Sequence, residues 1–144
     1  MTRVHFYEFD GGLEAALALS CRLAAKAHAQ GLDTLVHCAD PAALERLDLL
    51  LWAQPASSFL PHGRVPNPRC PITLGGGDPG HHHGLLINLA PVAPGWFSRF
   101  ERLAEFVHGD DPGHRAQMRE RFRFYRDRGY DTRHSKLDAQ TLAA

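Results

Sequence analysis

The N-terminal third of the chain alternates between strand-like and helix-like hydrophobic patterns, and this order constrains the fold more than any other feature. Residues 4–9 are rich in aromatic and β-branched side chains and end at Asp10, Gly11 and Gly12, which predicts a strand and a turn. Residues 13–30 carry apolar side chains at helical spacing, and residues 34–38 and 40–52 predict a second strand and helix. This βαβα order favours parallel strands covered by helices.

Beyond residue 52 the pattern becomes irregular. Short apolar runs at residues 58–61 and 72–74 predict two further strands, and the run at residues 85–89 predicts a buried strand. A short helix is expected from about Pro94, and residues 104–108 fit either its continuation or another strand. The chain from Asp131 onward is polar with little core-forming content. We therefore expect a domain over residues 1–130 and a mobile polar tail over residues 131–144.

Length and cysteine content indicate the class of protein. A chain of 144 residues is long enough for one domain with its own core. Its cysteines, Cys21, Cys38 and Cys70, are odd in number and contain no CxxC pair, which fits free thiols in a reducing compartment. No secretory signal pattern is present, and no stretch approaches the roughly 18 apolar residues of a membrane span. We expect a cytoplasmic protein without a membrane partner.

Positive charge is concentrated in residues 114–128. This segment carries six arginines and two acids, a net charge of plus four, so the other 129 residues carry minus four in a chain of zero formal charge. Asp111 suits the N-cap of a helix, Pro112 its first position, and Gly129 the left-handed residue that ends it. The segment is thus predicted to be a basic helix that binds an anionic partner.

The arginines of this helix share one face. At about 100° per residue, an arc of roughly 80° holds Arg115, Arg119, Arg123 and Arg126. The flank of the arc is apolar and holds Met118, Phe122 and Tyr125. A phosphate backbone requires only the charge, whereas a peptide that combines carboxylates with a large apolar group uses both, so we favour an acidic peptide over nucleic acid. The alternative is a solvated helix face whose arginine stems cover the edge of the core.

No motif for catalysis or metal binding is found. Residues 10–12 occupy the place of a phosphate loop, but neither a dinucleotide fingerprint nor a Walker lysine follows them. His81, His82 and His83, with Cys70 or His62, are candidate zinc ligands, but adjacent histidines on a loop do not converge as i, i+4 ligands do. No nucleophile elbow or informative carboxylate pair is present. We expect no catalytic residue, metal or cofactor.

Residues 51–62 (LWAQPASSFLPH) contain a Leu-Trp pair and a Ser-Phe-x-Pro-His stretch. The chain resembles the chi subunit of the bacterial DNA polymerase III holoenzyme, whose members carry these motifs at this place. The likeness includes the Phe6-Tyr7 strand, residues 86–89 and 100–103, and the motif from Arg119 to Tyr130, in the family's order over residues 3–130. The resemblance implies a single-domain, Rossmann-like α/β fold, with a mixed, mostly parallel sheet and helices on both faces.

The resemblance also implies a non-catalytic adaptor. Family members join the clamp loader, through its psi subunit, to the acidic C-terminal tail of the single-stranded DNA-binding protein. Tail-binding positions are expected at Arg115, Arg119, Phe122, Arg123 and Arg126. Psi-binding positions are expected at Phe59 and Pro61, with Trp52 nearby; for Trp52 an ordinary core position is an equal alternative.

Two other functions remain as competitors. A general single-stranded nucleic-acid binder would use the arginine arc and nearby aromatic side chains, and its affinity would depend steeply on salt. A nucleotide-binding or nucleotide-hydrolysing α/β protein would melt at a higher temperature in the presence of nucleotide. In the adaptor hypothesis, nucleic acid is contacted only indirectly.

Overall fold

The computed structural model describes residues 1–53, 60–67, 70–80 and 84–138. Seven strands, three α-helices and one short 3-10 helix follow one another along these residues. In chain order they are β1 (Arg3–Phe9), α1 (Gly12–Ala29), β2 (Thr34–His37), α2 (Pro41–Trp52), β3 (His62–Arg64), β4 (Ile72–Gly75), β5 (Leu85–Asn88), the 3-10 helix (Phe97–Arg99), β6 (Arg102–His108), α3 (Pro112–Asp127) and β7 (Asp131–Lys136).

All seven strands belong to one sheet in the order β3-β4-β2-β5-β6-β1-β7. Every neighbouring pair among them is parallel. The predicted α/β class is confirmed, and the sheet of the described residues is wholly parallel rather than mixed. Strands β2, β4 and β5 are buried along their whole length except His37, as expected for parallel strands covered on both faces.

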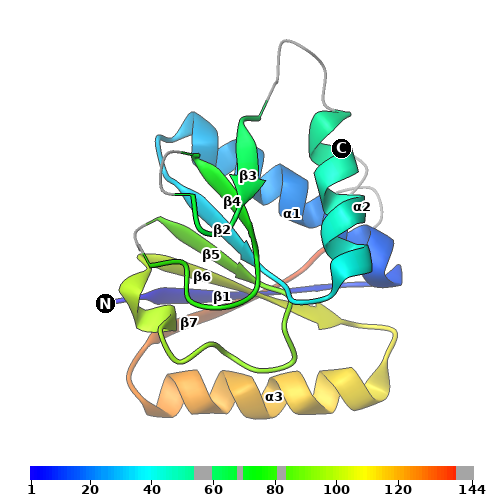
Figure 1. Cartoon of the computed structure of the whole chain (residues 1–144). Helices are drawn as coiled ribbons and strands as arrows, with labels where there is room; N and C mark the ends of the chain where they lie inside the picture. Colours follow the sequence, from blue (N-terminus) through cyan, green and yellow to red (C-terminus); the bar gives the residue numbers. More distant parts are fainter. Residues whose placement is uncertain (54–59, 68–69, 81–83, 139–144) are drawn as a thin grey trace.

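Helices α1 and α2 pack on one face of the sheet, and α3 covers the other face (Figure 1). The core on the α1 and α2 side includes Leu17, Leu47 and Ile87, and the core on the α3 side includes Phe6, Leu103 and Tyr125. The helices therefore lie on both faces, as predicted. None of the described helices is long and apolar enough to cross a membrane.

Three expectations about individual segments change. Residues 102–108 form strand β6, which resolves the open choice between helix and strand. The strand expected at residues 58–61 begins at His62 in the described chain, while residues 58 and 59 lie outside the described residues. Residues 131–136, expected in the tail, form β7 and pair with β1, so the sheet continues past the expected domain end at residue 130. The sequence pattern did not predict β7 because this edge strand is exposed on both sides and polar throughout.

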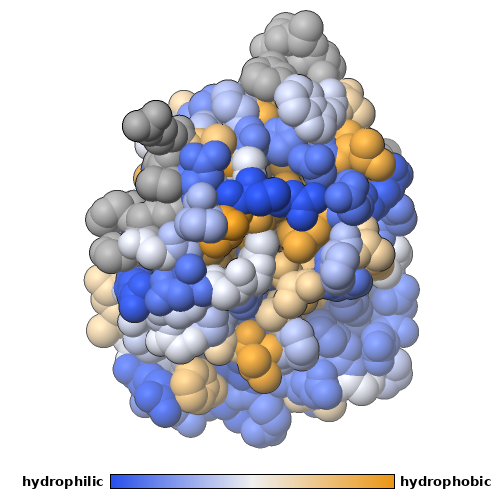
Figure 2. Space-filling view, viewed as in Figure 1, coloured by the Kyte–Doolittle hydropathy of each residue, from blue (hydrophilic) through white to orange (hydrophobic). Residues whose placement is uncertain are grey.

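The basic helix begins and ends where the sequence predicted. The Asp111 side chain accepts a hydrogen bond of 3.1 Å from the backbone N–H of His114, and Pro112 occupies the first turn. Gly129, with φ of 88°, takes the left-handed conformation after the last turn. Figure 2 shows the side of the molecule formed by α3, at the bottom of the view, as largely hydrophilic.

Candidate functional site

A groove of about 470 Å³ runs along α3, between this helix and strands β1, β6 and β7. We call it the α3 groove. One wall carries the four arginines of the predicted arc, Arg115, Arg119, Arg123 and Arg126. The floor is apolar, with Phe6 and Val107 from the sheet and Met118 and Phe122 from the helix. The structure thus brings all five residues predicted to bind an acidic peptide into one concave surface.

Packing of the helix fixes which face of α3 the arginines occupy. Met118 and Tyr125 are buried against the sheet, while Arg115, Arg119, Arg123 and Arg126 remain exposed. Phe122 is half-buried, and its ring meets that of Phe6 edge to face, with centroids 5.2 Å apart. Phe122 is therefore held from below and offers its remaining surface to the groove.

The charges in the α3 groove are not equally compensated. Arg123 forms an ion pair with Glu120 at 2.7 Å, and Arg126 forms one with Asp127 at 3.4 Å. Exposed ion pairs of this kind contribute little to stability. Within the described part of the chain, neither Arg115 nor Arg119 forms an ion pair within 4.0 Å. These two guanidinium groups are the ones most available to an incoming carboxylate.

The opposite side of the groove carries an acid and a histidine. The Glu8 carboxylate and the His134 ring lie 2.9 Å apart, on β1 and β7. A carboxylate here repels an acidic ligand, and its contact with His134 holds it on the side of the groove opposite the arginines. No sign of this pair is found in the sequence, because Glu8 lies in a predicted strand but its partner His134 lies on β7, which was not expected.

Arg121 has a different role from the arginines of the arc. It donates a hydrogen bond of 3.1 Å to the fully buried Glu105 carboxylate of β6, and another to the Pro91 carbonyl. The same carboxylate accepts a hydrogen bond of 2.7 Å from the Tyr125 hydroxyl and one of 3.2 Å from the Asn88 amide. Burial raises the pKa of Glu105, and Arg121 and the hydrogen bonds oppose that rise. Sequence reasoning missed this network, whose sign in the sequence is one acid, Glu105, between the apolar residues of β6.

The second predicted surface lies at the end of α2. The Trp52 side chain is 59% exposed, so the alternative of a core position is excluded. Its ring meets that of His62 edge to face with centroids 5.0 Å apart, and His62 also contacts Asp48 at 2.8 Å. Pro61 is half-buried next to His62. Phe59 lies outside the described residues.

Leu49, one turn before Trp52, is 58% exposed. Two large apolar side chains are therefore exposed on the last turns of α2, which is unusual for a helix that also buries Leu47 and Leu51. We call Leu49, Trp52 and Pro61 the α2 patch. It lies beside β3, at the sheet edge opposite β7 (Figure 1).

The described residues contain no group of three His, Cys, Asp or Glu side chains arranged to hold a metal ion. The candidate zinc ligands His81, His82 and His83 lie outside the described residues. Cys21 and Cys38 are buried free thiols, and burial raises the pKa of Cys21 to about 11. This makes Cys21 a poor nucleophile near neutral pH.

Comparison with known proteins finds one family over nearly the whole chain. A family model described as "DNA polymerase III chi subunit, HolC" matches residues 1–133. A DNA polymerase III subunit chi from Pseudomonas aeruginosa is 42% identical over 140 residues, covering 95% of this chain and 98% of the relative. Proteins of the same name from Escherichia coli and Haemophilus influenzae are each 30% identical, covering 91% and 78% of this chain and 95% and 81% of the relatives.

Proposed function

Since this chain belongs to the DNA polymerase III chi subunit family, we propose that it is a non-catalytic adaptor of the replicative polymerase in the cytoplasm. In this proposal the α3 groove binds the acidic C-terminal tail of the single-stranded DNA-binding protein, and the α2 patch binds the psi subunit of the clamp loader. The single observation that carries it is the α3 groove, with four arginines beside an aromatic floor.

The chemistry of the α3 groove suits an acidic peptide that ends in an aromatic residue. Arg115 and Arg119, which have no ion pair within the described residues, offer forked donors to side-chain or terminal carboxylates. The apolar floor around Phe122 and Met118 can desolvate a phenyl ring. Each charge-assisted hydrogen bond contributes about 1.5–3 kcal/mol, and part of this gain offsets the free energy that association costs.

The α2 patch suits a helix or an extended segment of a protein partner. An exposed Trp side chain is typical of interface anchors, and Phe59, two residues before Pro61 in the sequence, would add a second aromatic anchor. Because β3 and β7 are the two edge strands of the sheet, the α2 patch and the α3 groove lie at opposite edges. An adaptor with this layout can bind both partners at once.

A three-component capture experiment tests the bridging function. Immobilised psi subunit is loaded with this protein and then exposed to full-length single-stranded DNA-binding protein or to the same protein lacking its C-terminal tail. The proposal requires capture of the full-length protein only, and only when this chain is present. Capture of the tail-less form to the same extent would reject the bridging function.

The competing function is general binding of single-stranded nucleic acid by the arginine arc. Each phosphate contact would make the affinity for an oligonucleotide steeply dependent on salt. Phe6, Val107 and Met118 in the floor are buried and Phe122 is partly exposed, so the groove offers little surface on which successive bases could stack, and this favours the peptide. A titration of oligothymidylate into wild type and Arg119→Ala at several salt concentrations, in the absence of any other protein, distinguishes the two functions, because the competing function alone requires oligonucleotide binding that depends on the arc.

A further inference from the structure

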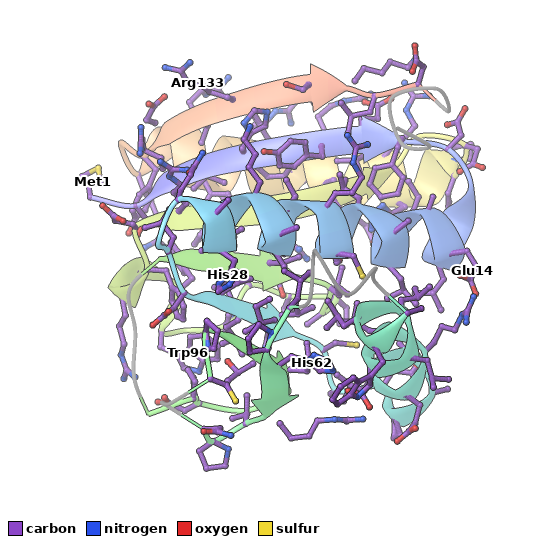
Figure 3. All side chains as sticks on the ribbon, turned by 90° about the horizontal axis from the view of Figure 1, so that it is seen from above. Met1, Glu14, His28, His62, Trp96 and Arg133 are labelled. Atoms are coloured by element: carbon purple, nitrogen blue, oxygen red, sulfur yellow. The ribbon has the colours of Figure 1, made fainter. Side chains whose placement is uncertain are left out.

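A second pocket of about 380 Å³ opens on the other face of the sheet, at the amino-terminal ends of its strands. We call it the amino-end pocket. It lies between the last turns of α1 and the first residues of β1, β6 and β7. Figure 3 shows Arg133 of β7 at the same end of the sheet as Met1, which precedes β1.

Strand register separates the amino-end pocket from the α3 groove. His5 of β1 pairs with Arg133 of β7, and Phe6 pairs with His134. Side chains alternate between the two faces of a strand, so His5 and Arg133 line the amino-end pocket while Phe6 and His134 line the α3 groove. The two sites therefore share the same strands but face opposite sides of the sheet.

The lining of the amino-end pocket is strongly positive. Four cations, Arg3, Lys26, Arg102 and Arg133, face one acid, Asp131. Asp131 lies 3.6 Å from Arg133, so its charge is already directed to one of the four. The surplus of three positive charges exceeds what a single carboxylate neutralises and matches a phosphate or polyphosphate group, since a phosphate monoester carries about two negative charges.

Arg102 is held in place beside the amino-end pocket. Its Nη1 bonds the Gln30 side-chain oxygen at 3.3 Å, which holds the guanidinium between β6 and α1. Its Nε is buried and has no hydrogen-bond acceptor within the described part of the chain. The buried Nε is not reachable from the pocket, but the Nη1 contact pre-organises the guanidinium for an anion.

The same pocket contains a flat surface for a planar group. The rings of His5 and Tyr7 are stacked, with centroids 4.2 Å apart and planes within 4°. Burial, followed by the charges of Arg133 and His134, lowers the pKa of His5, which favours an uncharged ring at neutral pH. The apolar part of the lining includes Leu23, Ala27 and Leu32. Aromatic platforms beside cations are the usual surface for nucleobases.

We propose that the amino-end pocket binds a nucleotide, with its phosphate groups among Arg3, Lys26, Arg102 and Arg133 and its base against the apolar and aromatic lining. A volume of about 380 Å³ is that of a small-ligand site. The nucleotide is either free or the phosphorylated end of a single DNA strand, which share this chemistry. The inference goes beyond the adaptor function and does not depend on it.

Calorimetric titration of the full chain at low salt tests this inference with three probes: ADP, inorganic pyrophosphate and 5′-phosphorylated pentathymidylate. Arg133→Gln and Lys26→Gln remove exposed cations of the pocket. Arg46→Gln is the matched control, because Arg46 is also exposed and paired with an acid, Glu14, but lies on α2. We expect each pocket variant to bind the nucleotide probe roughly tenfold more weakly, the effect of one charge-assisted hydrogen bond, and Arg46→Gln to bind as wild type does.

Either nucleotide probe binding with this pattern supports the inference, and preference for ADP or for the oligonucleotide identifies the source of the phosphate. Three results would overturn it. The first is that the wild type binds neither ADP nor the oligonucleotide, and the second is that Arg46→Gln and Arg133→Gln weaken nucleotide binding equally. The third is that pyrophosphate binds as tightly as ADP. Because Arg46→Gln and Arg133→Gln change surface positions, circular dichroism of each variant separates loss of binding from loss of fold.

Discussion

The Tyr125 hydroxyl of α3 donates a hydrogen bond of 2.7 Å to the Glu105 carboxylate of β6, and both side chains are fully buried. This bond joins the basic helix to the centre of the sheet. Burial and the neighbouring Glu105 carboxylate raise the pKa of Tyr125, so the hydroxyl keeps its proton and remains a donor. The rotation of α3, and with it the outward direction of the arginine arc, is fixed by this polar contact as well as by apolar packing.

Replacing Tyr125 by Phe removes the hydroxyl and leaves one Glu105 oxygen without its closest donor. We expect the free energy of unfolding to fall by about 1–3 kcal/mol, the cost of an unsatisfied buried polar group. Tyr130→Phe is the matched control, because its half-buried ring packs in the same apolar cluster. Urea denaturation followed by circular dichroism measures both. An equal loss in the two variants would show that the Glu105 contact is not the cause.

Arg121 and Arg119 lie two residues apart on α3 but should behave differently. Arg121→Ala leaves the buried Glu105 carboxylate without its cation, and we expect a loss of roughly 3–5 kcal/mol in the free energy of unfolding. Arg119→Ala removes an exposed side chain and should change that free energy by no more than about 0.5 kcal/mol. Thermal or urea unfolding of the two variants decides this. Similar stability of both would mean that the Glu105–Arg121 pair does not hold α3.

His114 links the start of α3 to the end of β6 in a pH-dependent way. Its Nδ1 accepts a hydrogen bond of 3.0 Å from the backbone N–H of His108, which a protonated ring cannot do. Burial, and then the charge of His108, lowers the pKa of His114 below its usual 6.5.

In the window between the lowered pKa of His114 and 6.5, the unfolded chain therefore binds the proton more readily than the folded chain. The free energy of unfolding should therefore rise with pH through this window. The contribution of His114 is present above pH 6.5 and is lost as the pH falls through the window. Denaturation at a series of pH values measures how the free energy of unfolding depends on pH. We expect this dependence to be weaker in His114→Gln than in His28→Gln, which alters an exposed histidine of α1. Identical slopes in the two variants would contradict the assignment.

Trp52 and Arg119 should affect different partners. Trp52→Ala removes an exposed aromatic anchor of the α2 patch, so psi binding should weaken by about 2 kcal/mol or more while tail-peptide binding is preserved. Leu13→Ala is a matched control, since Leu13 is another large exposed apolar side chain, at the start of α1. Calorimetry with each partner measures both affinities. Equal damage to both interactions by Trp52→Ala would argue against separate surfaces.

The sequence predicted those elements whose residues follow a strong period or carry capping residues. The α3 bounds followed from Asp111, Pro112 and Gly129, and the arc of four arginines followed from helical geometry alone. Strand β7 could not be predicted in this way, because an exposed edge strand shows no alternation of polar and apolar residues. The separation of Arg121 from the other arginines depends on Glu105, sixteen residues earlier on another element, and only tertiary structure brings the two together.

The most direct test of the adaptor account is calorimetric titration of a peptide with the C-terminal tail sequence of the single-stranded DNA-binding protein. Wild type, Arg119→Ala and Arg128→Ala are compared at one salt concentration. Arg128 is the matched control: it carries the same charge at the end of the same helix, but it lies over the Phe124 ring, 4.2 Å from its centroid, and does not line the α3 groove. We predict that Arg119→Ala weakens binding by about 1.5–3 kcal/mol and that Arg128→Ala stays close to wild type. Unchanged affinity in Arg119→Ala, with an unchanged circular dichroism spectrum, would contradict the account.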